Sequence, residues 1–133
     1  WGRRGNGPPY GFNYPKGIGV DPDSRNVWVV HQEIGAPDIT VHRPSGEFLM
    51  QVLEPLRRDA VAFRDGEAFV LASGTITVRD AATGAEKRRW GGVSGRNLGI
   101  DQATGNLYVP NGNQVRVYSP TGTPLASLSG RPA

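Results

Sequence analysis

The feature that most constrains this chain is a glycine that returns at a fixed interval. Gly46, Gly84 and Gly122 lie 38 residues apart, and each closes a short turn of the form Pro-Ser-Gly, Ala-Thr-Gly or Pro-Thr-Gly. A fixed interval of this size indicates a fold built from copies of one small unit, each of which needs its neighbours to bury its apolar face.

Three columns of short apolar runs align on this interval, and a fourth run follows each glycine turn. The 19 Gly and 11 Pro are spread along the chain, which indicates many short turns and therefore many short strands. Four strands in each copy are typical of a β-propeller blade. The aligned runs are 17–21, 60–64 and 97–101; then 27–30, 68–71 and 107–110; then 39–42, 76–79 and 115–118.

The sequence therefore predicts an all-β fold: three four-stranded antiparallel sheets that form half of a propeller. All of residues 1–133 belong to this single segment. The three blades are expected at about 15–53, 58–90 and 96–129.

Aromatic residues occupy one position of the repeat. Trp28, Phe69 and Tyr108 lie in the second run of their copies, where we expect them to form the core between blades. Trp90, and Trp1 at the equivalent place, are expected to anchor the end of a blade.

The first copy resembles the NHL repeat. Its stretch Phe12-Asn13-Tyr14-Pro15-Lys16-Gly17-Ile18-Gly19-Val20-Asp21 is similar to the Phe and Pro followed by a Gly-Ile-Ala-Val-Asp-like strand of that family, and the likeness extends over essentially the whole chain. The resemblance implies a ring that is usually six-bladed. It also implies three possible roles: a non-catalytic binding module, a lyase or hydrolase with a metal at the axis, or an RNA-binding module.

The residues favour the first of these roles. The chain has no cysteine, which excludes disulfides, thiolate metal sites and cysteine nucleophiles. A catalytic zinc needs three protein ligands, and His31 has no companion set, so we predict no catalytic residue, no metal and no cofactor. His31 and His42 are expected to be surface or edge histidines, and Glu54 and Asp59 solvated loop charges.

The basic residues gather on one predicted face. Net charge is +3, with 13 Arg and 2 Lys, and the loops that share the top face of a propeller carry most of the excess. This face suits an anionic partner, whether acidic protein, glycan or RNA. The candidate partner-binding residues are Arg3, Arg4, Lys16, His31, Arg57, Arg58 and Arg96.

No apolar run approaches the ~20 residues of a membrane helix, so no membrane insertion is expected. The compartment is not fixed by the sequence, with an extracytoplasmic or extracellular one slightly favoured.

Three blades do not close a ring, and both flanks of such a half-propeller are expected to be apolar. Two copies related by a twofold axis would cover both flanks at once. The sequence thus predicts a binding scaffold that completes a six-bladed ring by self-association. The alternative is that the remaining blades belong to a longer chain.

Overall fold

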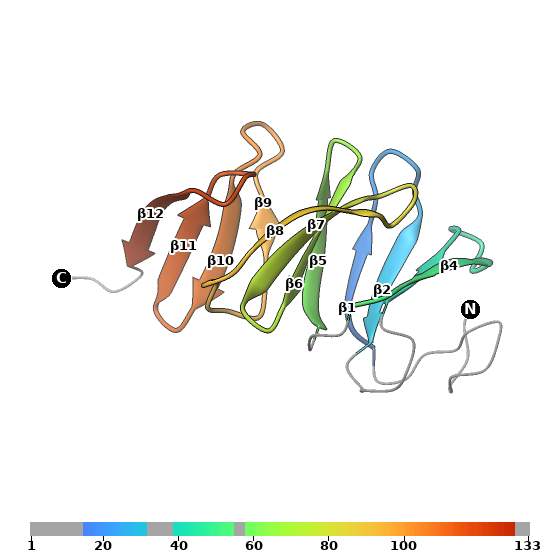
Figure 1. Ribbon diagram of the computed structural model, residues 1–133, viewed down its shortest axis with the longest axis horizontal. Coiled ribbons are helices and arrows are strands. Elements are labelled where there is room, and N and C mark those ends of the chain that lie inside the picture. Colours follow the sequence, from blue (N-terminus) through green and yellow to red (C-terminus); the bar gives the residue numbers. More distant parts are fainter. Residues whose placement is uncertain (1–14, 32–38, 55–57, 130–133) are drawn as a thin grey trace.

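The chain folds into three four-stranded sheets that lie side by side in chain order (Figure 1). The computed structural model describes residues 15–31, 39–54 and 58–129. Blade 1 contains β1 (Pro15–Val20), β2 (Val27–His31), β3 (Ile39–His42) and β4 (Phe48–Val52). Blade 2 contains β5 (Arg58–Arg64), β6 (Glu67–Ala72), β7 (Thr75–Asp80) and β8 (Glu86–Trp90). Blade 3 contains β9 (Gly99–Ile100), β10 (Leu107–Asn111), β11 (Gln114–Tyr118) and β12 (Pro124–Ser129).

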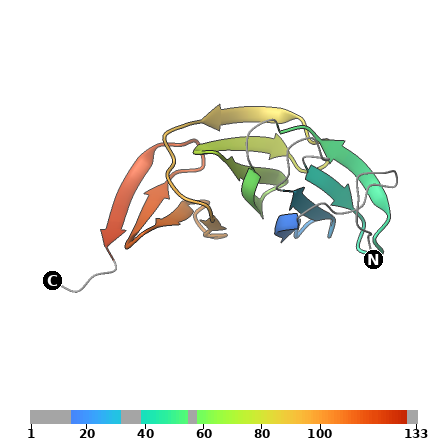
Figure 2. The same ribbon diagram turned by 90° about the horizontal axis from the view of Figure 1, so that it is seen from below.

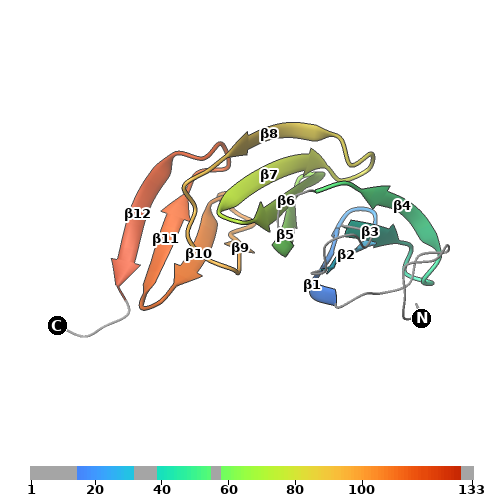
Figure 3. The same ribbon diagram turned by 60° about the horizontal axis from the view of Figure 1, so that its bottom comes forward.

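Within each sheet the strands are antiparallel and lie in chain order. Seen from below, the sheets form an arc (Figure 2). The first strands β1, β5 and β9 lie on its concave side, and the last strands β4, β8 and β12 lie on its convex side (Figure 3). No helix occurs in the described part of the chain. The predicted fold class, an all-β set of propeller blades, is confirmed.

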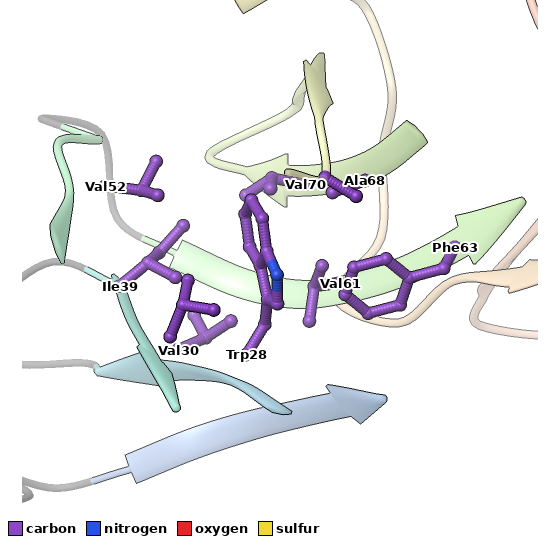
Figure 4. Close-up of a cluster of buried hydrophobic side chains, with 10 residues drawn as sticks. Trp28, Val30, Ile39, Val52, Val61, Phe63, Ala68 and Val70 are labelled. Atoms are coloured by element: carbon purple, nitrogen blue, oxygen red, sulfur yellow. The ribbon is translucent and has the colours of Figure 1, made fainter. Parts of the chain in front are cut away.

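Two apolar cores join the three sheets. In the core between blades 1 and 2, the Trp28 indole lies edge-on to the Phe63 ring, with centroids 5.6 Å apart and planes at 76° (Figure 4). In the core between blades 2 and 3, Phe69 and Leu107 are almost completely buried. Trp28 and Phe69 therefore lie between blades, as predicted, whereas Tyr108, at the equivalent place in blade 3, is only half-buried.

Aspartates close three of the turns through their carboxylates. Asp21 accepts hydrogen bonds from the Asp23 N–H and the Ser24 hydroxyl, and Asp101 accepts one from the Ala103 N–H. Asp80 accepts hydrogen bonds from the N–H groups of Thr83 and Ala82, and these backbone donors lower the pKa values of the Asp80 and Asp101 carboxyls. These are Asx-type turns, and they account for the aspartates at strand ends without a ligand.

Candidate functional site

The structure separates the predicted top-face residues into three groups. Arg3, Arg4 and Arg57 lie outside the described residues. His31 and Arg58 are buried, whereas Lys16 and Arg96 line one cavity at the axial end of the blades.

Arg58 is buried and links blade 2 to blade 1 through hydrogen bonds. Its side chain is on β5, the residue is 2% exposed, and its guanidinium donates to the carbonyl oxygens of His31 and Glu54, both at 2.7 Å. These bonds join the end of β2 and the chain after β4 to the first strand of blade 2. Arg58 thus holds the two blades together and is not part of an exposed basic surface.

The two histidines are also buried, which corrects the expectation that they lie at the surface or an edge. The Nε2 atoms of His31 and His42 each lie 2.9 Å from Thr40 Oγ1, and all three residues are at most 1% exposed. Burial lowers the pKa of His42, opposed in part by the carbonyl of Gly46. These histidines are members of a packed polar network, so His31→Ala is expected to cost stability and not to be neutral.

Lys16 and Asp59 form the first part of the axial site. Lys16 Nζ lies 2.6 Å from Asp59 Oδ1, and the two side chains are 21% and 5% exposed. Each residue is the extra residue of a β-bulge, because the pairing register shifts between Pro15 and Gly17 and between Arg58 and Ala60. A bulge redirects a side chain, and here two bulges aim opposite charges at each other across blades 1 and 2. Asp59 is therefore a buried, paired carboxylate, not the solvated loop charge expected from the sequence.

Arg96 completes the site from blade 3. It lies before β9, its side chain is exposed, and it makes no hydrogen bond or ion pair with any described residue. Lys16, Asp59 and Arg96 share an open cavity of about 460 Å³ that also touches Ile18 of β1, Val61 of β5 and Leu98, which precedes β9. A second cavity of about 280 Å³ adjoins it, since Asp59 and Arg96 line both.

Sequence reasoning named these basic residues but missed what brings them together. Gly17 and Ala60 pair with Val30 and Leu71, at equivalent places in their blades. Counted back from Ile100, which pairs with Leu107, the residue equivalent to Lys16 and Asp59 in blade 3 is Arg96. A charged residue thus occupies the same register position in each blade, and this recurrence was the available signal.

Among the described residues, no group of three or more His, Cys, Asp and Glu could hold a metal ion. No helix in the same ranges is long and apolar enough to cross a membrane.

Comparison with known proteins finds similar folds among solved structures. No protein-family model matches the chain, and no curated protein matches it. Among solved structures, it is similar to a chain of hydrazine synthase from Kuenenia stuttgartiensis, with 16% identity and a TM-score of 0.73 over 96% of this chain and 38% of that chain. It is also similar to BamB from Moraxella catarrhalis, with 16% identity and a TM-score of 0.69 over 88% of this chain and 37% of that one.

Both neighbours are β-propeller proteins, so the comparison supports a propeller fold. The chain spans less than two fifths of the length of either. At this level of identity the likeness concerns architecture alone.

Proposed function

We propose that this chain is half of an NHL-type propeller, that a second copy supplies the other half, and that the closed ring is a non-catalytic scaffold that binds partners at its axial end. The observation that carries the proposal is an incomplete pattern of burial. The side chains that each blade offers to the next are buried where the next blade is present and open where it is not.

This burial pattern is seen on the face of each blade that is turned toward the next blade in the chain. In blade 1, Trp28, Val30, Ile39 and Val41 are all 0% exposed against blade 2. Pairing register identifies their counterparts in blades 2 and 3. In blade 2 these are Phe69, Leu71, Ile76 and Val78, at most 1% exposed against blade 3. In blade 3 they are Tyr108, Pro110, Val115 and Val117, of which Pro110 is exposed, Tyr108 and Val115 are half-buried, and only Val117 is buried.

The face of each blade that is turned toward the preceding blade shows the same pattern, and here blade 1 is the blade without a neighbour. Val61 and Phe63 of β5 are 8% and 5% exposed because blade 1 covers them. Their counterparts on β1, Ile18 and Val20, are 66% and 52% exposed. Both flanks of the half-propeller therefore carry exposed apolar side chains.

The flank of blade 1 is open only near the axis. Val29, Thr40 and His42 lie on the same face as Ile18 by register, and all three are buried. We therefore expect the inner strand of blade 1 to make the main contact with a docking blade. The sequence predicted that both flanks are apolar, and on blade 1 the exposed apolar side chains belong to the inner strand.

A repeated contact between glycine turns and outer strands specifies the geometry of docking. A Cβ on Gly84 would lie 3.0 Å from Val52 Cγ2, and one on Gly122 would lie 2.6 Å from Trp90 Cδ2, so each turn sits directly on the outer strand of the preceding blade. Val52 and Trp90 are equivalent by register, and the third member of this set is Leu128, which is 51% exposed. In the proposed dimer, the Gly46 turn of the second copy covers Leu128.

A second copy suits these flanks because they are the two halves of one interface that already occurs twice in the chain. Burying apolar surface contributes roughly 25 cal/mol per Å², so covering both flanks stabilises the dimer even after the cost of association. A twofold axis satisfies both flanks at once and leaves neither open.

Native mass tests the proposal. Sedimentation velocity at micromolar concentration should give twice the 14.3 kDa of one chain. Leu128→Asp should shift the population toward monomer, because it places a charge in the predicted contact. Ala82→Asp is the control: Ala82 is exposed and lies in the β7–β8 turn of blade 2, whose two neighbouring blades belong to the same chain, so dimerisation should be unchanged.

Because the chain has no cysteine, a disulfide can report the contact itself. Oxidation of Ser45→Cys/Leu128→Cys should give a covalent dimer. Thr83 is equivalent to Ser45, but its turn already sits on blade 1 of the same chain, so Thr83→Cys/Leu128→Cys should not cross-link. A folded monomer at every concentration would overturn self-association and leave blades of a longer chain as the occupant.

A further inference from the structure

We infer that Lys16, Asp59 and Arg96 form a charged collar at one end of the axial channel, and that this collar binds the carboxylate of a small apolar ligand through Arg96. This site would be a binding site of the proposed scaffold, so it rests on that function. All the residues that carry it nevertheless belong to one chain.

The collar follows from the repeat. Each blade places a charged residue at the same register position, within β1 and β5 and just before β9, and the three inner strands converge on the concave side of the arc (Figure 3). Inner strands of a propeller line its central channel. A position that recurs once in each blade therefore surrounds the channel mouth, and here it carries plus, minus and plus.

Two of these charges compensate each other. The 2.6 Å contact between Lys16 and Asp59 pairs them, and the Asp59 side chain is only 5% exposed. Arg96 remains as the uncompensated charge of the cavity, because no described residue pairs with it. The described residues that line the cavity thus carry a net charge of one positive unit, which matches one carboxylate.

The backbone that carries Arg96 is held rigidly. Val93 is 1% exposed within the core between blades 2 and 3, and its N–H donates to the Gly74 carbonyl at 3.0 Å. Gly95 has a φ of 150°, and a Cβ there would lie 2.5 Å from Val109 Cγ1 and 2.8 Å from Pro110 O. Only glycine fits so close to β10, and this packing fixes where the next residue begins. The backbone at Arg96 is therefore pre-positioned, which reduces the part of the entropy lost on binding that comes from ordering the main chain.

The walls of the cavity favour an apolar group attached to the anion. Ile18, Val61, Leu98 and Pro110 line it beside the charged residues. A guanidinium presents two parallel N–H donors that match the two oxygens of a carboxylate. A doubly charged phosphate would meet the Asp59 carboxylate in the same cavity, so a single negative charge is preferred.

Amide chemical-shift titration tests the site with isobutyrate, a branched carboxylate, at pH 7 and constant ionic strength. We expect saturable shifts at Gly17, Val61 and Leu98, and none with the neutral analogue isobutyramide. Arg96→Gln should weaken isobutyrate binding about tenfold or more, because it removes a charge-assisted hydrogen bond. Arg116→Gln is the matched control, since Arg116 is exposed, has no partner among the described residues and lies outside the cavity.

Asp59→Asn sharpens the test. It removes the negative charge and leaves two cations in the cavity, so the preference should move from isobutyrate toward inorganic phosphate. Unchanged binding in Arg96→Gln, or wild-type phosphate binding as tight as isobutyrate binding, would overturn the carboxylate site. So would isobutyrate shifts that do not saturate.

The mass of the same samples separates this result from ring closure. A monomer that binds isobutyrate contradicts the dimer and leaves the collar intact. A dimer that does not bind isobutyrate contradicts only the collar.

Discussion

At the interface between blades 1 and 2, Trp28 fills the centre and meets Phe63 edge to face, while at the interface between blades 2 and 3 the equivalent residue is the smaller Phe69. The registers of the two interfaces are the same, and in both a glycine turn sits on the outer strand of the preceding blade. The apolar part of the contact is therefore repeated, with different side-chain sizes.

Two arginines of blade 2 donate hydrogen bonds in opposite directions, one to each neighbouring blade. Arg79 reaches back from blade 2 and donates to the carbonyl oxygen of Leu53, with Glu54 Oε1 3.5 Å away. Arg88 reaches forward and donates to the carbonyl oxygen of Pro120, while it binds both oxygens of Glu67. Blade 2 thus supplies the arginine at both interfaces.

These arginines are not part of the repeat. By register, Arg79 corresponds to His42 and Tyr118, and Arg88 corresponds to Met50 and Ala126. The difference teaches that apolar columns and glycine turns set how one blade sits on the next. The polar contacts are individual additions that strengthen an arrangement already determined.

The largest expected effect is at the centre of the first interface. Trp28→Ala should destabilise the fold by about 3–5 kcal/mol, since Trp28 is fully buried and leaves a large cavity. Denaturant unfolding measures the change. Phe69→Ala should cost less because the ring is smaller, and the reverse order would contradict the comparison.

Removing the backward arginine should have the next largest effect. Arg79→Met takes away donors to the carbonyl oxygens of Leu53 and Gly84 and a positive charge 3.5 Å from the buried Glu54 carboxylate, and about 2–4 kcal/mol should be lost. The free energy of unfolding is again the measurement. A loss of unfolding free energy no larger than that of Arg88→Met would show that the two arginines stabilise their interfaces equally.

The glycine turn can be tested against a glycine with the same backbone freedom. Gly122 has a φ of 100° and contacts Trp90, whereas Gly66 has a φ of 73° and nothing within 4 Å of the position that a Cβ would take. Gly66→Ala should cost about 1 kcal/mol from backbone strain alone, and Gly122→Ala about 1–3 kcal/mol because the methyl also collides with the indole. Equal losses would mean that the contact contributes nothing.

The forward arginine should give a small, pH-dependent effect. The hydrogen bonds from Arg88, helped by Lys87, lower the pKa of Glu67 to about 2 from an ordinary 4.5. A depressed pKa in the folded state stabilises the protein above pH 4.5, and this contribution disappears as the pH falls from 4.5 toward 2. After allowance for solvent screening at the rim, it amounts to about 1 kcal/mol.

Arg88→Met should remove most of this acid sensitivity and leave blade 2 with the residue type found at the same place in blade 1. Unfolding curves at pH 6 and pH 3 measure it. An acid sensitivity equal to that of the wild type would assign the effect to other carboxylates.

The sequence predicted the parts of the fold that repeat. The 38-residue glycine interval and the alternating third strands identified the three sheets, because one buried face imposes a period of two on each strand. It did not predict that His31, His42 and Arg58 are buried, since burial of a polar side chain depends on partners that are distant in sequence. Asp59 was missed for the same reason: its partner Lys16 lies 43 residues away, and two bulges bring them together.

The glycine turns that rest on Val52 and Trp90 have a consequence for how many blades a ring can hold. We expect the size of the side chain beneath each turn to influence the angle between the two blades that meet there. A larger or smaller side chain at this position would change the angle between one pair of adjacent blades. In a closed ring, these angles sum to one full circle. In the proposed ring, Leu128 would occupy this position where the two copies meet.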